Sequence, residues 1–130
     1  MTDVFKKLNF KGQTPILILQ APKEFTGEMK KMSKETAIDH APDRQEPYAF
    51  CLGFGAMLAD LVRAAKSIRI VSNEESIVWL AYPKQTSKRY RSDLNRDKCV
   101  EALKPLGYSP VRQIAIDDDW SALRYARTET

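Results

Sequence analysis

The chain has 130 residues, of which 43% are hydrophobic and 29% are charged, with a formal net charge of +4 and a pI near 9.1. This length is that of one domain, and the composition is that of an ordinary globular protein, which excludes a disordered or fibrous chain. No apolar run approaches the roughly 18 residues of a membrane span. The first ten residues lack the apolar core of a signal peptide. We expect a soluble, cytoplasmic protein without membrane contact, forming a single domain over residues 1–130.

Apolar and polar segments alternate along the chain in lengths that suit strands and helices. Pro15 to Pro22 is a near-continuous apolar run bounded by prolines, which is typical of a central parallel strand buried on both faces. Strands are expected at 15–22, 35–40, 48–54, 76–83, 111–116 and 120–127. Helices are expected within 2–12, from Phe25, from Gly55, and from Ser92 or Asp93, where either side chain can cap the helix. We predict an α/β sandwich of three layers, with a mostly parallel sheet.

The end of the chain predicts a hairpin. Asp117 to Asp119 form a tight acidic turn, and residues 120–127 then run back as an antiparallel edge strand. An exposed edge strand invites pairing with a second copy, so a homodimer through this strand is one alternative to a monomer.

A specific series of motifs runs through the second half of the chain. The motif residues are Trp79, Ala81, Tyr82, Pro83 and Lys84, then Ser87, Lys88, Asp93, Leu94, Arg96 and Asp97, and finally Asp119, Trp120, Ser121, Leu123 and Arg124. This pattern resembles a bacterial family of small Rossmann-like proteins that is known only as a domain of unknown function. The resemblance implies a single Rossmann-like domain and brings no established activity.

The second half of the chain is also distantly similar to the C-terminal half of class I methyltransferases, in its order of helix, strand, helix and terminal hairpin. Those enzymes need a glycine-rich turn after the first strand, where the backbone approaches the cofactor. Here that turn reads Gln20-Ala21-Pro22-Lys23, without glycine, and Pro22 lacks a backbone donor. A phosphate-binding GxxxxGK motif is absent as well. The sequence therefore predicts no cofactor.

The net charge is concentrated in one loop and the helix after it. Six basic residues and two aspartates lie between Lys84 and Lys98, for a net charge of +4, so the rest of the chain is neutral. In an open parallel sheet, ligands bind at the carboxyl ends of the strands, and a helix N-terminus favours an anion. The candidate ligand-binding residues are Lys84, Ser87, Lys88, Arg89 and Arg91, with Gly53 and Gly55, where glycine would let a ligand approach the backbone.

Three other features receive plainer interpretations. Asp117 to Asp119 are interpreted as a solvated turn rather than a metal site, although they could also pair with the basic loop. His40, beside Asp39 near the same edge, is interpreted as an ordinary loop residue. Cys51 and Cys99 have no metal-type spacing and are expected to be buried thiols. The sequence therefore assigns no catalytic residue and no metal ligand.

These observations favour a non-enzymatic module that binds an anionic small molecule at the loop from Lys84 to Asp93. Nucleic acid is a less favoured partner, because a charge of +4 is modest for such a function. The alternatives are a diverged methyltransferase-like enzyme and a structural or protein-interaction domain.

Overall fold

The computed structural model describes residues 1–128, and its helices and strands alternate along most of the chain. The elements are α1 (Asp3–Lys7), β1 (Ile16–Leu19), the 3-10 helix η1 (Lys23–Phe25), α2 (Thr26–Met32), β2 (Ile38–Asp39), β3 (Phe50–Phe54), α3 (Leu58–Val71), β4 (Ile77–Pro83), α4 (Arg96–Leu103), the 3-10 helix η2 (Lys104–Leu106), β5 (Tyr108–Ala115) and β6 (Trp120–Arg127). No helix within residues 1–128 is long and apolar enough to cross a bilayer.

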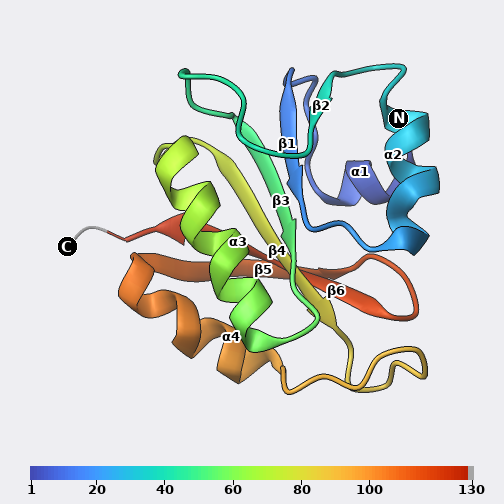
Figure 1. The fold of residues 1–130 in the computed structure, drawn as a ribbon, viewed down its shortest axis with the longest axis vertical. Coiled ribbons are helices and arrows are strands. Elements are labelled where there is room, and N and C mark those ends of the chain that lie inside the picture. Colours follow the sequence, from blue (N-terminus) through green and yellow to red (C-terminus); the bar gives the residue numbers. More distant parts are fainter. Residues whose placement is uncertain (129–130) are drawn as a thin grey trace.

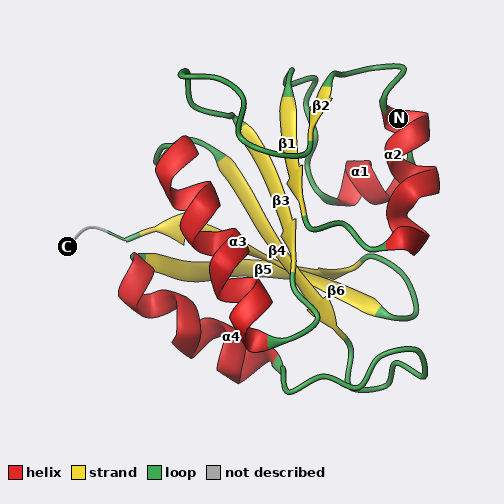
Figure 2. Cartoon of the chain, in the orientation of Figure 1, coloured by secondary structure: helices red, strands yellow, loops and turns green. Residues whose placement is uncertain are grey.

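The strands form one sheet in the order β2-β1-β3-β4-β6-β5 (Figure 2). The pairings from β2 through β4 are parallel, while β6 runs antiparallel to both β4 and β5. Because two reversals restore the direction, β5 points the same way as β4. The predicted α/β fold, with a mostly parallel sheet and a C-terminal antiparallel hairpin, is confirmed.

Helices cover both faces of the sheet and divide the core in two (Figure 1). Helices α3 and α4 pack on one face, where they bury Leu61, Ile68 and Leu103 against alternate residues of β4. Helices α1 and α2 cover the other face, where Trp79 points into a cluster rich in phenylalanine. The indole nitrogen of Trp79 donates to the carbonyl oxygen of Leu8 at 2.8 Å, which ties the end of α1 to the sheet.

Strand β6 is not the edge strand that the sequence predicts. It lies between β4 and β5, and β5 forms the edge instead. The reason is burial on both faces: Trp120 and Ala122 enter one core cluster, while Leu123 and Tyr125 enter the other. Strand β5 carries exposed residues along its middle, as an edge strand can. The predicted pairing of two copies through β6 is therefore wrong, because β4 and β5 already occupy both sides of this strand.

Helix α4 also begins later than predicted. Its first residue is Arg96, and the side chain of Asn95 accepts the backbone N–H of Lys98 at 2.9 Å as the N-cap. Asp93 instead accepts the backbone N–H of Leu58 at 2.9 Å, at the start of α3. The two residues predicted to cap α4 therefore belong to the loop before it.

Both cysteines are buried and unpaired in the structure. Burial raises the pKa of the Cys51 thiol and of the Cys99 thiol to about 12. Each side chain therefore remains a neutral thiol at physiological pH and packs as a small apolar group.

Two glycines of the β3 region are required by close packing. A Cβ atom on Gly53 would lie 2.9 Å from Leu80 Cδ2, and one on Gly55 would lie 2.4 Å from the backbone nitrogen of Leu61. The second contact is with backbone, which cannot rotate away. Gly55→Ala should therefore lower the free energy of unfolding by about 1 to 3 kcal/mol, measured by urea denaturation.

Gly27 provides the matched control, because a Cβ atom at this position of α2 would meet no atom within 4 Å. Gly27→Ala should leave stability unchanged or raise it by up to about 1 kcal/mol, since alanine is the better helix former. Equal destabilisation by both substitutions would contradict the packing role of Gly55.

Candidate functional site

The carboxyl ends of β1 and β3 flank the position at which the strand order reverses. From β1 the chain moves outward to β2 and then returns to β3 on the other side. In open α/β sheets, ligands bind in the crevice that such a reversal creates. A pocket of about 260 Å³ lies here, which we call the switch-point pocket. Its lining residues are Gln20, Pro22, Phe54, Gly55, Ala56, Asp60, Arg63, Tyr90 and Trp120.

Gln20 spans the crevice between β1 and α3. Its backbone has a left-handed φ of 59°, which is uncommon for a residue with a side chain. Its amide nitrogen donates to the carbonyl oxygen of Phe54 at 2.7 Å and to that of Asp60 at 2.9 Å. The side chain therefore bridges the end of β3 and the first turn of α3, where a glycine turn would leave the space open.

An aromatic cluster with one carboxylate closes the neighbouring side of this pocket. The ring of Trp120 lies 5.2 Å from that of Phe54 and 4.9 Å from that of Tyr90. The carboxylate of Glu24 accepts the Trp120 indole N–H at 3.0 Å and the Tyr90 hydroxyl. Glu24 thus joins η1 to the loop after β4 and to the start of β6.

The titration of this cluster follows from its hydrogen bonds. Burial alone would raise the pKa of Glu24, but the donors Trp120 and Tyr90 outweigh it and lower the pKa of this carboxyl. Burial and the Glu24 carboxylate together raise the pKa of Tyr90 to about 12. At neutral pH the pair is therefore an ionised acceptor and a neutral donor.

The basic loop pairs with the acidic turn, as the sequence left open. Ser87 donates from its hydroxyl to the Asp119 carboxylate at 2.7 Å, and Arg89 forms an ion pair with the same carboxylate at 3.4 Å. The backbone N–H of Lys84 donates to the Asp119 carbonyl oxygen at 2.8 Å. Asp117 accepts two backbone N–H groups of its own turn. Within residues 1–128, no three His, Cys, Asp or Glu side chains gather as a metal site requires.

The structure separates the predicted ligand-binding residues into different surroundings. Lys84, Ser87 and Arg91 line a pocket of about 360 Å³ together with Tyr90 and Asn95. Lys88 instead faces a second opening shared with Asp118 and Asp119. Gly53 is buried under α3, and Gly55 reaches the switch-point pocket. The ligand-binding role of these residues stays a prediction.

Asp39 lies away from the carboxyl edge, because β2 is short. It pairs in register with Leu17, near the beginning of β1 rather than its end. Its carboxylate accepts the hydroxyl of Tyr48, a residue that precedes β3. His40 follows it as an exposed residue.

The sequence predicts that the turn from Gln20 to Lys23 lies at the carboxyl edge, but it reveals neither Glu24 nor the bridging role of the Gln20 side chain. Glu24 lies 66 positions before Tyr90 and 96 before Trp120, so only the folded topology brings the three together. The one available signal for Gln20 is the missing glycine at its turn.

Comparison with known proteins supports a fold and shows no family. No family model matches the sequence, and no curated protein matches it. Solved structures do match the fold, and those reported below are methyltransferases. One is the ribosomal protein L11 methylase from Lactobacillus delbrueckii subsp. bulgaricus, with a TM-score of 0.61, 9% identity, and coverage of 97% of this chain and 77% of that one.

Two further matched structures are also methyltransferases that share the fold at low sequence identity. The magnesium protoporphyrin IX methyltransferase ChlM from Synechocystis PCC 6803, solved with bound SAH, gives a TM-score of 0.62 at 8% identity, covering 96% of this chain and 78% of its own. The N-methyltransferase NodS from Bradyrhizobium japonicum WM9 gives 0.59 at 7% identity, with coverage of 97% and 93%. The distant similarity to methyltransferases is therefore confirmed at the level of fold.

These matches correct two predictions made from the sequence. The preference for a non-enzymatic module is overturned, because the matched structures are those of enzymes. The preference for an anionic small molecule is overturned as well, because the ligands named in the matched structures are SAM and SAH. The ion pair between Arg89 and Asp119 contributes to this, since it offsets one of the positive charges of the loop.

Glu24→Gln should destabilise the protein by about 1 to 2 kcal/mol at pH 7, because an ionised acceptor of two hydrogen bonds becomes neutral. The folded pKa of Glu24 is lowered, so its stabilisation is present above the unfolded pKa near 4.5 and is lost as the pH falls through the folded value. The gap between wild type and variant should therefore close in acid, measured by urea denaturation from pH 7 to pH 3.

Glu101→Gln is the control, because Glu101 is an exposed helix residue whose partner is Lys104. This variant should lie within about 0.5 kcal/mol of wild type across the same pH range. A gap for Glu24→Gln that stays constant down to pH 3 would show that its ionisation is not linked to folding.

Proposed function

We propose that this chain is a diverged methyltransferase-like enzyme that binds S-adenosylmethionine or S-adenosylhomocysteine in the switch-point pocket. The observation that carries the proposal is the position of this pocket, at the carboxyl ends of β1 and β3 where the strand order reverses. The fold shared with methyltransferases supports it.

The lining of the pocket suits a ligand with a planar ring. Tyr90 supplies a partly exposed ring, supported by the buried ring of Trp120, which in turn packs on Phe54, and a purine base can stack on such a ring. Arg63 adds a guanidinium group, which can stack on a ring or donate to an acceptor.

The same region lacks two features that tighten cofactor binding in related folds. Gln20 fills the turn where glycine would admit the ligand, and Pro22 offers no N–H. In dinucleotide-binding domains, an acidic residue about 20 positions beyond the first turn binds the ribose hydroxyls. Here Asp39 has that place in the sequence, but it lies away from the carboxyl edge and accepts the hydroxyl of Tyr48. We therefore expect weak binding, with a Kd of about 0.1 to 1 mM, and assign no step of methyl transfer.

Ligand contacts from the basic loop are part of this proposal. Tyr90 lines both the switch-point pocket and the pocket formed by Lys84, Ser87 and Arg91. These three residues therefore lie next to any ligand that extends past Tyr90. Membership of the uncharacterised family and a single domain over residues 1–130 also remain predictions.

Isothermal titration calorimetry with S-adenosylmethionine and S-adenosylhomocysteine tests the proposal. Both ligands should give saturable heat at about 0.1 to 1 mM. Arg63→Ala should weaken binding about threefold to tenfold, because this substitution removes a donor from the pocket wall.

Lys66→Ala is the matched control, since Lys66 is an exposed cation on the same helix as Arg63 and does not line the switch-point pocket. Its affinity should equal that of wild type. Absence of heat with both ligands at millimolar concentration would rule out the proposed function.

A further inference from the structure

Two backbone carbonyl oxygens converge on one point in the wall of the switch-point pocket. They belong to Phe54, at the end of β3, and to Asp60, in the first turn of α3. The amide nitrogen of Gln20 occupies this point, 2.7 Å from the Phe54 oxygen and 2.9 Å from the Asp60 oxygen. We call the two oxygens the acceptor pair.

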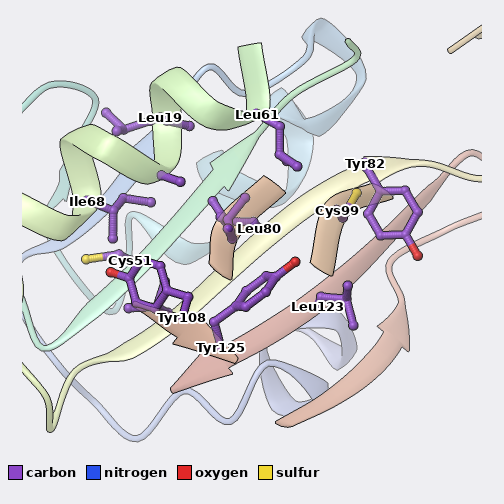
Figure 3. Packing of buried hydrophobic residues seen from close by; sticks show 14 of the residues in the cluster. Leu19, Cys51, Leu61, Ile68, Leu80, Tyr82, Cys99, Tyr108, Leu123 and Tyr125 are labelled. Atoms are coloured by element: carbon purple, nitrogen blue, oxygen red, sulfur yellow. The ribbon is translucent and has the colours of Figure 1, made fainter. Parts of the chain in front are cut away.

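The acceptor pair belongs to backbone that the core holds in place. Leu19 and Leu61, the neighbours of Gln20 and Asp60 in the sequence, are both buried in the cluster beneath α3 (Figure 3). Phe54 is buried in the cluster on the other face of the sheet. The spacing of the two oxygens is therefore set by the fold and does not depend on the Gln20 side chain.

The side chain of Gln20 is the movable member of this arrangement. It is exposed, and exposed side chains change rotamer within nanoseconds. Its amide can therefore leave the acceptor pair without any unfolding of β1, β3 or α3. Once it leaves, the Phe54 and Asp60 oxygens can accept hydrogen bonds from another donor in the pocket.

The acceptor pair selects a nitrogen donor. Carbonyl oxygens accept N–H groups and do not bind a carboxylate, which has only acceptor oxygens. An amide group has two donors, and Gln20 uses both here. An ammonium group has three donors, and its charge makes each hydrogen bond stronger. A protonated amine is therefore a better occupant of this point than the amide that holds it.

We propose that the Gln20 amide is a built-in competitor for the ligand, because it occupies the acceptor pair that binds the ligand's amino group. A ligand with a protonated amine must displace Gln20 to bind fully, whereas a ligand without an amine gains nothing at this point. This proposal rests on the proposed function, since it assigns the amino end of an S-adenosyl ligand to the Phe54 and Asp60 oxygens.

Calorimetry of Gln20→Gly with two matched compounds tests the proposal. S-adenosylhomocysteine carries the amine, and 4-(5′-adenosylthio)butanoic acid is the same molecule without it. The variant should bind S-adenosylhomocysteine about fivefold to thirtyfold more tightly than wild type, because no amide has to be displaced. Its affinity for the compound without the amine should change by less than about twofold. The backbone φ of 59° at this position suits glycine, so the variant should fold.

Gln113→Ala is the matched control. Gln113 is also an exposed glutamine whose amide donates within the protein, to the Tyr82 hydroxyl at 3.2 Å, and it does not line the switch-point pocket. Its affinity for S-adenosylhomocysteine should equal that of wild type.

Nuclear magnetic resonance of the glutamine side-chain amides gives a second readout in the wild-type protein. The Gln20 amide signal is identified by its absence in Gln20→Gly. S-adenosylhomocysteine should shift this signal in a saturable way, because the amide loses both carbonyl acceptors. The compound without the amine should leave the signal in place.

The outcomes separate this proposal from the proposed function. If wild type binds S-adenosylhomocysteine but Gln20→Gly binds it no more tightly, the competitor role is wrong and the proposed function stands. An equal gain for both compounds would also overturn the competitor role, because the variant would then only have made space. Absence of heat with both wild type and Gln20→Gly would overturn both. Heat with Gln20→Gly alone, and only with the amine present, would support the competitor role and rule out the proposed function for the natural chain.

Discussion

The pairing of β6 with β4 is the contact on which most of this structure depends. Six consecutive residues of β4, residues 78–83, pair with β6 from Tyr125 back to Trp120. This ladder places Leu123 and Tyr125 in the core under α3 and α4, and Trp120 and Ala122 in the core under α1 and α2. Strand β6, near the C-terminus, therefore contributes side chains to both halves of the hydrophobic core.

The same ladder also assembles the candidate site. Because Trp120 pairs with Pro83, the acidic turn that precedes Trp120 reaches the basic loop that follows Pro83. Asp119 then binds Ser87 and Arg89, which holds the loop against the sheet. Tyr90 of that loop is in turn positioned to meet Glu24, so a carboxylate from η1 completes the cluster.

Local sequence patterns predict most of the elements and fail where long-range pairing decides. Apolar runs locate β1, β3 and β4, and apolar residues at i, i+3, i+4 and i+7 from Leu58 locate α3, because burial on one or both faces leaves a direct pattern in the sequence. The sequence prediction places β6 wrongly at the edge of the sheet. The order of elements along the chain is the same whether the last strand lies beside β4 or at the edge, so that order cannot decide between the two. The available signal for its central position is that β6 is mostly apolar, whereas the middle of β5 is polar.

The candidate site was less predictable for a related reason. Charge identifies the loop after β4, yet charge alone does not show that Asp119 offsets part of it. The roles of Gln20 and Glu24 depend on carbonyl and indole groups that lie far away in the chain. A missing glycine shows that the turn after β1 is unusual, but not that a side-chain amide takes its place.

The exposed edge of β5 has a consequence for how the protein behaves at high concentration. An open strand edge is a template on which further chains can add without limit, as in amyloid fibrils. Here Pro110 removes a donor, the register shifts between Pro110 and Arg112, and Lys7 donates from its side chain to the carbonyl oxygen of Ala115. Each feature breaks the regular row of backbone groups, so the edge is a poor template for fibril growth.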